Sequence, residues 1–439
     1  MHGRLRHHRV FMAAAAALAL AAVAACGSGG SATGSAPAAG DGPVTLTFWT
    51  HTHPPMVELN KKIISEYEAQ HPNVKIEYQT VPNTEFATKM LTALSTGAGP
   101  DIINMDDGAL RGEYIPKKLL VPVDPAALGK GSAAEVEAGF VPGTLDGAKG
   151  PDGKLYGLPS EFNGTVFAIN KKHFADAGLD PAKPPATWQE VIDDGKKLNA
   201  AGHKQAFNFL YLHSGWYAQW FQTLANETGA TMITPDGKTT QLDSPGNIKA
   251  LQTWVDLART SGIADPKTSS RDATSPYQDI TSGTQSMAIM FPWAMEQIKQ
   301  DNPEVYSQLQ LVPLPAVDTA TPPINRIYGY FWAVNAASKK QAEAWKFISY
   351  LSSQHDRWLT DVSFVQPVVG WDTTPAAQKI PFIDVIAKAY GNGRFDQVGP
   401  HWNEVQDIIH TAVDKAVFDG APVADVLRDA NAAAQRSIS

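Results

Sequence analysis

Cysteine is almost absent from this chain of 439 residues, in which Cys26 is the only one. A single cysteine excludes a disulfide within the chain. Basic residues are also outnumbered, with 36 Lys and Arg against 44 Asp and Glu and a net charge of −8 at pH 7. No basic stripe is available to neutralise phosphates, so we exclude nucleic acid as a partner.

Other features are missing as well. After residue 25 no apolar run approaches the roughly 20 residues of a membrane span, so we expect a soluble body. No internal repeat of roughly 20 to 50 residues is visible, which argues against a solenoid or propeller. The chain lacks a Gly-x-Ser-x-Gly elbow, a Gly-rich phosphate loop with Lys and a His-Glu-x-x-His zinc helix. These absences favour a protein that is not an enzyme and needs no cofactor.

The N-terminus has the order of an export signal. Residues 1–9 are basic, residues 10–25 are an unbroken apolar run, and Val-Ala-Ala-Cys closes it at Cys26. The apolar run is too short to span a membrane and is typical of a cleaved signal. The Ala-Cys ending resembles the lipobox of bacterial lipoproteins, in which the cysteine is diacylated and becomes the new N-terminus. We therefore expect an exported protein, anchored by lipid to the outer face of the cell membrane.

Residues 26–43 follow as a flexible tether made almost entirely of Gly, Ser, Ala, Thr and Pro. Such a segment buries too little apolar surface to fold. Removal of residues 1–25 takes away three arginines and no acid, leaving 33 basic and 44 acidic residues and a net charge of −11. The remaining body of about 395 residues is large enough for two lobes.

Strand and helix patterns alternate along the body, which predicts an α/β fold with a parallel sheet. Residues 44–49, 74–78 and 101–105 read as strands, and the helix between the first two has its apolar stripe at Met56, Leu59, Ile63, Ile64 and Tyr67. Residues 156–159 and 165–169 read as strands around a polar bend. Capping boxes at Thr187 and Ser338 predict two further helix starts.

Open α/β sheets bind ligands beyond the carboxyl ends of their strands, so the segments that follow strands are candidates for a site. They combine aromatic residues with carboxylates and amides, as at Trp49, His51, Asp106, Glu161 and Asn163. Trp293, Tyr328 and Tyr330 belong to the same class. Aromatic faces stack on sugar rings, and polar groups hydrogen-bond the hydroxyls, so this mixture favours a pocket for a neutral polyol. Trp220 and Phe221 lie at core spacing, whereas Trp216, beside Gly215, is expected to face the cleft.

Several alternatives stay open on the residues alone. A glycerol phosphate would need a basic residue, and Arg111, Arg271, Arg326 and Arg394 are candidates. A polyamine would need acids, and Asp106, Asp107 and Glu161 could supply them. The same three carboxylates could serve a secreted glycoside hydrolase. The pair His51 and His53 lacks a clear third ligand, so we expect no metal site.

Six segments in a characteristic order resemble the extracellular solute-binding proteins of bacterial ABC importers, in particular the sugar-binding group that includes the maltose-binding protein. They are Gly-Pro-Asp-Ile at 99–102, Gly-Lys-Leu-Tyr-Gly-Leu-Pro at 153–159, Phe-Ala-Ile-Asn-Lys at 167–171, Pro-Ala-Thr-Trp-Gln-Glu at 185–190, Met-Ala-Ile-Met-Phe-Pro-Trp at 287–293 and Trp-Ala-Val-Asn-Ala-Ala-Ser at 332–338. The resemblance runs from about residue 44 to the C-terminus.

The resemblance implies a periplasmic-binding-protein-like fold of type II, with two α/β lobes, a hinge and an interlobe cleft. The hinge crossings would fall near Glu161, Gly329 and Gln366. The lobes would then comprise residues 44–161 with 330–366, and residues 162–329 with 367–439.

The resemblance also implies that closure around a sugar or oligosaccharide signals to an ABC transporter permease, and we expect a monomer. By position in the family pattern the ligand-binding residues are Trp49, His51, Asp106, Glu161, Asn163, Trp216, Trp293, Tyr328, Tyr330, Gln366, Arg394 and Trp402. The chain has Gly329-Tyr330 where the family often has Gly-Gly, and this departure bears on the size of the pocket.

Overall fold

The structure is a computed structural model that describes residues 42–209, 217–234, 236–264, 275–317, 324–396, 398 and 401–438. Cys26 and the export signal lie outside the described residues, as do Trp216 and Arg271. Among the described residues, no helix is both long and apolar enough to cross a membrane.

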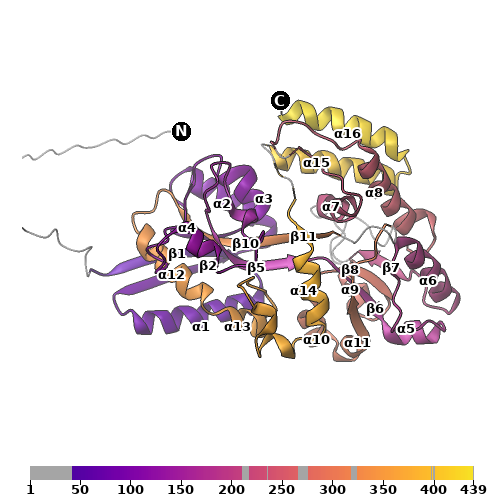
Figure 1. The fold of residues 1–439 in the computed structure, drawn as a ribbon, viewed down its shortest axis with the longest axis horizontal. Helices are drawn as coiled ribbons and strands as arrows, with labels where there is room; N and C mark the ends of the chain where they lie inside the picture. The colour runs from indigo at the N-terminus through magenta and orange to yellow at the C-terminus, as the bar shows by residue number, and fades with distance from the viewer. Residues whose placement is uncertain are drawn as a thin grey trace, which may run out of the picture. The chain divides into compact units, whose positions relative to one another are not determined.

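Within the described ranges the strands form two sheets (Figure 1). The first has seven strands: β1 Val44–His51, β2 Val74–Val81, β3 Ile102–Asp106, β4 Leu120–Val121, β5 Leu158–Gly164, β10 Asn325–Asn335 and β11 Gly393–Arg394. The second has four: β6 Val166–Asn170, β7 Phe207–Phe209, β8 Met287–Met290 and β9 Leu309–Val312. β1 runs parallel to β2 and β3, as predicted, but β10 is antiparallel to β3, so the first sheet is mixed.

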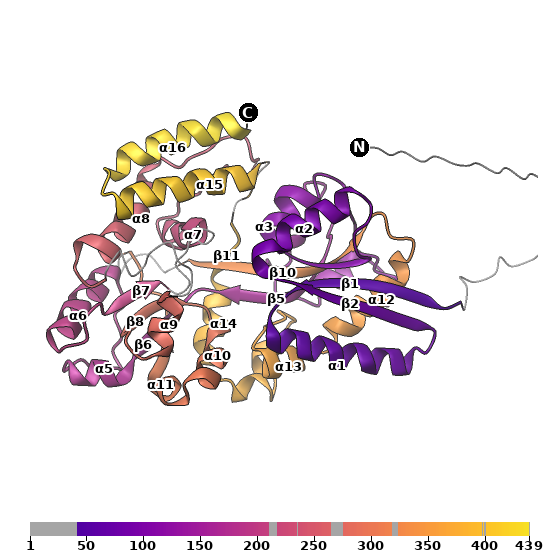
Figure 2. The same ribbon diagram turned by 180° about the vertical axis from the view of Figure 1, so that it is seen from behind.

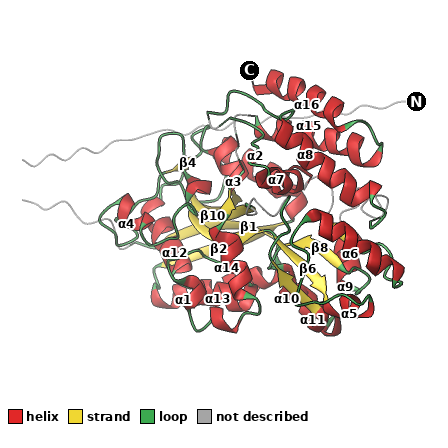
Figure 3. Cartoon of the chain, turned by 45° about the vertical axis from the view of Figure 1, so that its right-hand side comes forward, coloured by secondary structure: helices red, strands yellow, loops and turns green. Residues whose placement is uncertain are grey.

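Helices flank both sheets, as the colouring by secondary structure in Figure 3 shows. The first half of the chain contributes α1 Pro54–Gln70, α2 Asn83–Ser95, α3 Asp107–Ala109, the π-helix η1 Leu110–Tyr114, α4 Ala133–Glu137, α5 Lys171–Asp176, α6 Trp188–Ala200 and α7 Tyr217–Glu227. The second half contributes α8 Pro245–Val255, η4 Asp256–Thr260, α9 Ser275–Thr281, α10 Ala294–Asp301, α11 Pro303–Gln308, α12 Gln341–Ser352, α13 His355–Arg357, η5 Trp358–Val362, η6 Trp371–Thr373, η7 Ala377–Lys379, α14 Ile383–Gly391, α15 Trp402–Val413, η8 Asp414–Phe418 and α16 Val423–Ile438.

The apolar stripe predicted for the first helix is confirmed. Met56, Leu59, Ile63, Ile64 and Tyr67 are all buried on α1. Because residues three and four apart share one face of a helix, this stripe turns the whole side of α1 toward the core. Trp220 and Phe221 on α7 are also buried, in agreement with their predicted place in the core.

Two strands, β5 and β10, pair with each other and lead from the first sheet to the second (Figures 1 and 2). Only Thr165 separates β5 from β6, which belongs to the second sheet. The polar bend predicted near residue 160 is therefore wrong, because Glu161 and Asn163 lie inside β5. The strand is buried along its whole length, and its polar side chains find partners inside the protein, as Ser160 does by accepting a hydrogen bond of 2.5 Å from Asn104 Nδ2.

One of the two predicted capping boxes forms. At α6 the Thr187 hydroxyl accepts a hydrogen bond from the Glu190 amide, and the Glu190 carboxylate accepts one from the Thr187 amide. The box predicted at Ser338 is wrong, since α12 begins at Gln341 after Lys340. The Ser338 hydroxyl instead donates to the Asp101 carboxylate at 2.7 Å, and this buried acceptor outcompetes the helix end.

Candidate functional site

Four side chains of the first sheet form a row across β1, β3, β10 and β5, which we call the polar row: His51, Asp106, Tyr330 and Glu161. Tyr330 lies opposite Asp106 on β3 and opposite Glu161 on β5. Residues directly opposite one another in an antiparallel pair project from the same face of the sheet. The ring of His51 lies 4.5 Å from the ring of Tyr330. The register of the sheet thus brings together Asp106, Tyr330 and Glu161, and the ring contact adds His51, so four of the residues predicted from the sequence lie close together.

Glu161 and Asn163 supply the buried polar groups at one end of the polar row. Asn163 Nδ2 donates to Glu161 Oε1 at 2.7 Å. Glu161 Oε2 and Asn163 Oδ1 are buried and have no partner among the described residues. Burial raises the pKa of Glu161 to about 8, so the carboxyl is mostly protonated at neutral pH. The pair can therefore offer a hydroxyl group both a donor and an acceptor.

His51 is uncharged at the other end of the polar row. Burial, together with the proximity of His53, lowers the pKa of His51 to about 3. A neutral imidazole is one donor and one acceptor rather than a cation. Among the described residues no three His, Cys, Asp or Glu side chains are grouped so that they could hold a metal ion.

Asp106 ends β3 and begins the turn into α3. Its Oδ1 accepts a hydrogen bond of 3.0 Å from the Ala109 amide, so the carboxyl caps the short helix. Burial and the neighbouring charge of Asp107 raise the pKa of Asp106 to about 6. Asp106 is therefore the member of the polar row that still carries a negative charge near neutral pH.

An aromatic group lies beside the polar row. Trp293 Nε1 donates to the Tyr328 hydroxyl at 2.9 Å, and the rings of Trp293 and Phe291 are stacked with an interplanar angle of 9°. Tyr328 lies opposite Asn163 on β5. Since Trp293 follows β8 of the second sheet, this hydrogen bond connects the second sheet to the crossing strand β10.

Trp402 also lies near the polar row, although α15 is far from β3 in sequence. A Cβ placed on Gly108 would come within 3.7 Å of the Trp402 ring and 3.2 Å of Asp106 Oδ1. The buried indole therefore lies against the turn after Asp106, and the tighter of the two distances is the one to the Asp106 carboxyl.

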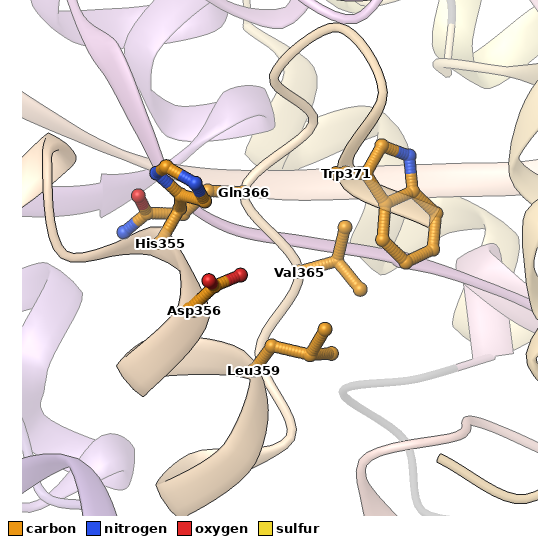
Figure 4. A pocket seen from close by; sticks show the side chains of 6 residues that line it. All are labelled: His355, Asp356, Leu359, Val365, Gln366 and Trp371. Carbon is orange, nitrogen blue, oxygen red and sulfur yellow. The ribbon is translucent and has the colours of Figure 1, made fainter. Parts of the chain in front are cut away.

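Three predicted residues have other surroundings. Trp49 is partly buried at the side of α2, where Lys89 Nζ lies 5.5 Å from its ring centroid. Arg394 is paired with Arg326 across β11 and β10. Gln366 lines a small pocket with His355, Asp356, Leu359, Val365 and Trp371 (Figure 4), and no residue of the polar row lines it. Trp216 lies outside the described residues.

Two of the four arginines named for an anionic solute, Arg111 and Arg326, have carboxylate partners. Arg326 holds Asp396 with both Nε and Nη2, at 3.0 and 2.8 Å. Arg111 holds Asp107 at 2.7 Å. The spacing of Asp107 and Arg111 could have predicted their contact, because residues four apart face each other on a helix. No sequence signal joins Arg326 to Asp396, so that pair could not be predicted from the sequence.

Comparison with known proteins gives a family model and several relatives. Residues 51–355 match the model described as "Bacterial extracellular solute-binding protein". An arabinooligosaccharide-binding protein of Halalkalibacterium halodurans is 24% identical over 280 residues, or 63% of this chain and 60% of that protein. An sn-glycerol-3-phosphate-binding periplasmic protein of Brucella abortus is 28% identical over 169 residues, or 35% of this chain and 36% of that protein.

Among solved structures, an ABC transporter solute-binding protein from Thermotoga lettingae TMO, bound with alpha-D-tagatose, superposes with a TM-score of 0.78. The two chains are 20% identical, and the match covers 90% of this chain and 100% of that one. This likeness confirms the α/β periplasmic-binding-protein fold expected from the sequence, here with two mixed sheets.

Proposed function

The chain belongs to the bacterial extracellular solute-binding protein family, and from that premise we propose that it captures a neutral sugar or oligosaccharide and delivers it to an ABC transporter permease. Members of such a family bind a solute without converting it, so the chain is not an enzyme and the glycoside hydrolase alternative falls. The arabinooligosaccharide-binding relative and the tagatose-bound structure support a sugar as the solute.

The charge balance of the polar row is the observation that carries the proposal. His51 is neutral and Glu161 mostly protonated at neutral pH, which leaves Asp106 as the ionised group of the row. Groups of this kind exchange hydrogen bonds with hydroxyls without requiring a counter-charge on the solute. Trp293, partly exposed beside the row, supplies an aromatic face for a sugar ring.

A glycerol phosphate is the second candidate, since one relative binds it. A phosphate needs uncompensated positive charge, and two of the four arginines named for it, Arg111 and Arg326, already hold carboxylates. A polyamine would need several ionised acids, whereas Glu161 is mostly uncharged at neutral pH. The proposal therefore favours a neutral solute over either charged one.

Closure between two lobes would couple binding to transport. We assign residues 44–161 with 330–366 to one lobe and residues 162–329 with 367–439 to the other, and β5 and β10 supply two of the crossings. A solute that contacts the polar row and Trp293 would bridge the lobes and favour the closed state. A preference of about 5.5 kcal/mol for that state moves a population from about 1:99 to about 99:1.

The sequence before residue 42 supports an exported lipoprotein, and we propose that it acts as a monomer. Diacylation of Cys26 would hold the body at the outer face of the membrane, and the tether would give it reach toward the permease.

A thermal-shift screen of residues 42–439 tests the proposed solute. The panel contains mono- and oligosaccharides, glycerol 3-phosphate and a polyamine. A ligand at 100 times its Kd stabilises the folded state by about 2.7 kcal/mol. We expect a sugar to raise the melting temperature and to be recovered unchanged. A shift from glycerol 3-phosphate or polyamine alone would overturn the proposed solute, and a consumed sugar would contradict binding without conversion.

A further inference from the structure

Four charged residues, three of them buried and Arg111 partly buried, form a closed circuit of contacts that begins and ends on β10; we call it the charge ring: Arg326, Asp396, Arg111 and Asp107. Arg326 on β10 holds the Asp396 carboxylate with Nε at 3.0 Å and Nη2 at 2.8 Å. The Asp396 carbonyl accepts from Arg111 Nη2 at 2.9 Å. The same nitrogen donates to Asp107 Oδ2 at 2.7 Å. Asp107 Oδ1 then accepts at 3.2 Å from the amide of Gly329, which returns the ring to β10.

The charge ring is balanced and largely shielded from water. The side chains of Asp107, Arg326 and Asp396 are 4%, 6% and 6% exposed, and that of Arg111 is 16% exposed. The ring contains two cations and two anions, so each buried charge is compensated. Bidentate guanidinium contacts fix direction as well as distance. Loss of one member would leave an opposite charge buried and unpaired, which is strongly destabilising.

Two contacts of the charge ring with β10 lie on either side of Tyr328 along the chain. Arg326 and Gly329 are the two points at which the ring meets β10, and Tyr328 lies between them in the chain. The Arg326 guanidinium also lies 5.2 Å from the centroid of the Tyr328 ring. The Tyr328 hydroxyl in turn accepts from Trp293.

The charge ring also holds the turn that follows Asp106. Asp107 and Arg111 belong to α3 and η1, which begin directly after Asp106. Phe395 is next to Asp396 in the chain. Its ring centroid lies 5.7 Å from Cζ of Arg111, and the ring packs against Phe162 of β5. The ring thus connects the segments that carry Asp106, Tyr328 and Glu161.

From this arrangement we infer that the charge ring is a positioning device: it holds Tyr328 of β10 and Asp106 at the end of β3 in place for the solute, and Arg326 and Asp396 act through Tyr328 rather than by touching the solute. The inference rests on the proposed sugar-binding function. It assigns a role to a buried ion pair that supplies no free charge to the site.

The test replaces Arg326→Met together with Asp396→Leu, because apolar pairs of similar volume often replace a buried ion pair without loss of stability. The matched control is Arg357→Met with Glu66→Gln, which removes another two-nitrogen arginine pair, between α13 and α1 and partly exposed. Backbone hydrogen exchange of residues 325–335 reports how firmly β10 is held, and calorimetric titration with arabinotriose and maltose reports affinity.

We expect the Arg326→Met, Asp396→Leu protein to remain folded, to exchange faster at residues 325–331, and to bind its sugar at least about tenfold more weakly. The control pair should leave the exchange rate of the β10 amides and the sugar affinity within about twofold of the wild type, since exposed ion pairs contribute little. Unchanged exchange at β10, or an affinity within about twofold of the wild type, would overturn the inference.

Two further measurements separate the inference from its premise. If the wild type binds neither sugar, the proposed solute fails in this test. The rate of backbone hydrogen exchange in β10 then still decides whether the charge ring holds the strand. If the ring variant does not fold, Arg326→Lys replaces it, because lysine keeps the charge but loses the two-nitrogen contact. In a Tyr328→Ala background the ring substitutions should have less than half of their effect on affinity, whereas fully additive effects would contradict action through Tyr328.

Discussion

Tyr330 of β10 lies directly opposite Glu161 of β5, and both side chains project from the face of the sheet that also carries Asp106. Burial raises the pKa of the Tyr330 hydroxyl well above its ordinary value, and the carboxyl groups of Asp106 and Glu161 raise it further. The hydroxyl therefore stays protonated between two carboxyl groups. A donor in that position suits a ligand with many hydroxyl oxygens.

Glu161→Gln is expected to remove a pH dependence of stability. The pKa of Glu161 is about 8 in the folded protein and 4.5 ordinarily, so the folded state binds more protons between these values. Stability contributed by the protonated carboxyl is present below about pH 4.5 and is lost as the pH rises toward about 8. Glutamine resembles the protonated acid and cannot ionise. Denaturant unfolding from about pH 5 to pH 9 should therefore show a smaller fall for Glu161→Gln than for the wild type.

The control for this prediction is Glu77→Gln, on the exposed face of β2. Its unfolding curve should follow that of the wild type at every pH. Parallel pH profiles for Glu161→Gln and the wild type would show that Glu161 ionises as an ordinary carboxyl, contrary to its burial.

Tyr328→Phe is expected to weaken sugar binding by about tenfold or less, because the Trp293 ring loses the hydroxyl that accepts from its Nε1. Trp293→Phe should cost at least as much, since it also removes part of the aromatic face. Titration of both single variants and of the double variant would measure their coupling. Tyr350→Phe, which removes a hydroxyl that accepts from Gln70, is the matched control and should leave affinity unchanged. Additive losses would mean that Tyr328 does not orient Trp293.

Gly108→Ala is expected to weaken binding more than it lowers stability. The new Cβ would come within 3.2 Å of Asp106 Oδ1, so the carboxyl must shift by a few tenths of an ångström, whereas the 3.7 Å approach to the Trp402 ring is an ordinary contact. Affinity should fall several-fold, as a titration can measure. At Gly391 a Cβ would meet nothing within 4 Å, so Gly391→Ala is the matched control. Equal affinities of the two variants would place Asp106 outside the site.

Cys26→Ser is expected to release the protein from the membrane. The substitution removes the only thiol of the chain and therefore the acceptor of a thioether-linked lipid. Fractionation of cells that produce the wild type and the variant would measure the share found with the membrane. A variant that still sediments with the membrane would contradict lipidation at Cys26.

Much of the fold follows from local pattern. The stripe of α1 and the Thr187 capping box depend on residues three or four positions apart, and both form as predicted. The bend near residue 160 was wrong because Ser160, Glu161 and Asn163 are polar, and polar residues in a short segment usually indicate a turn. Here the segment is a buried strand in which Ser160 bonds to β3 and Asn163 bonds to Glu161, while Glu161 Oε2 and Asn163 Oδ1 have no partner among the described residues.

The site was predictable in composition but not in arrangement. Aromatic and acidic residues after strands indicated His51, Asp106, Glu161 and Tyr330; the sheet register brings the last three together, and a ring contact with Tyr330 adds His51. The ion pair of Arg326 and Asp396 joins residues 70 positions apart, and such a contact leaves no periodic signal in a single sequence. Local pattern therefore shows which groups are present, while the tertiary fold determines which charges cancel.

The most direct test is a crystal structure of residues 42–439 with the sugar that gives the largest thermal shift. The account predicts a bound sugar with hydroxyls in hydrogen-bond contact with Glu161 Oε2 and Asn163 Oδ1, and with a ring face against Trp293. A sugar bound elsewhere, such as at the pocket lined by Gln366, with no contact to the polar row, would contradict it.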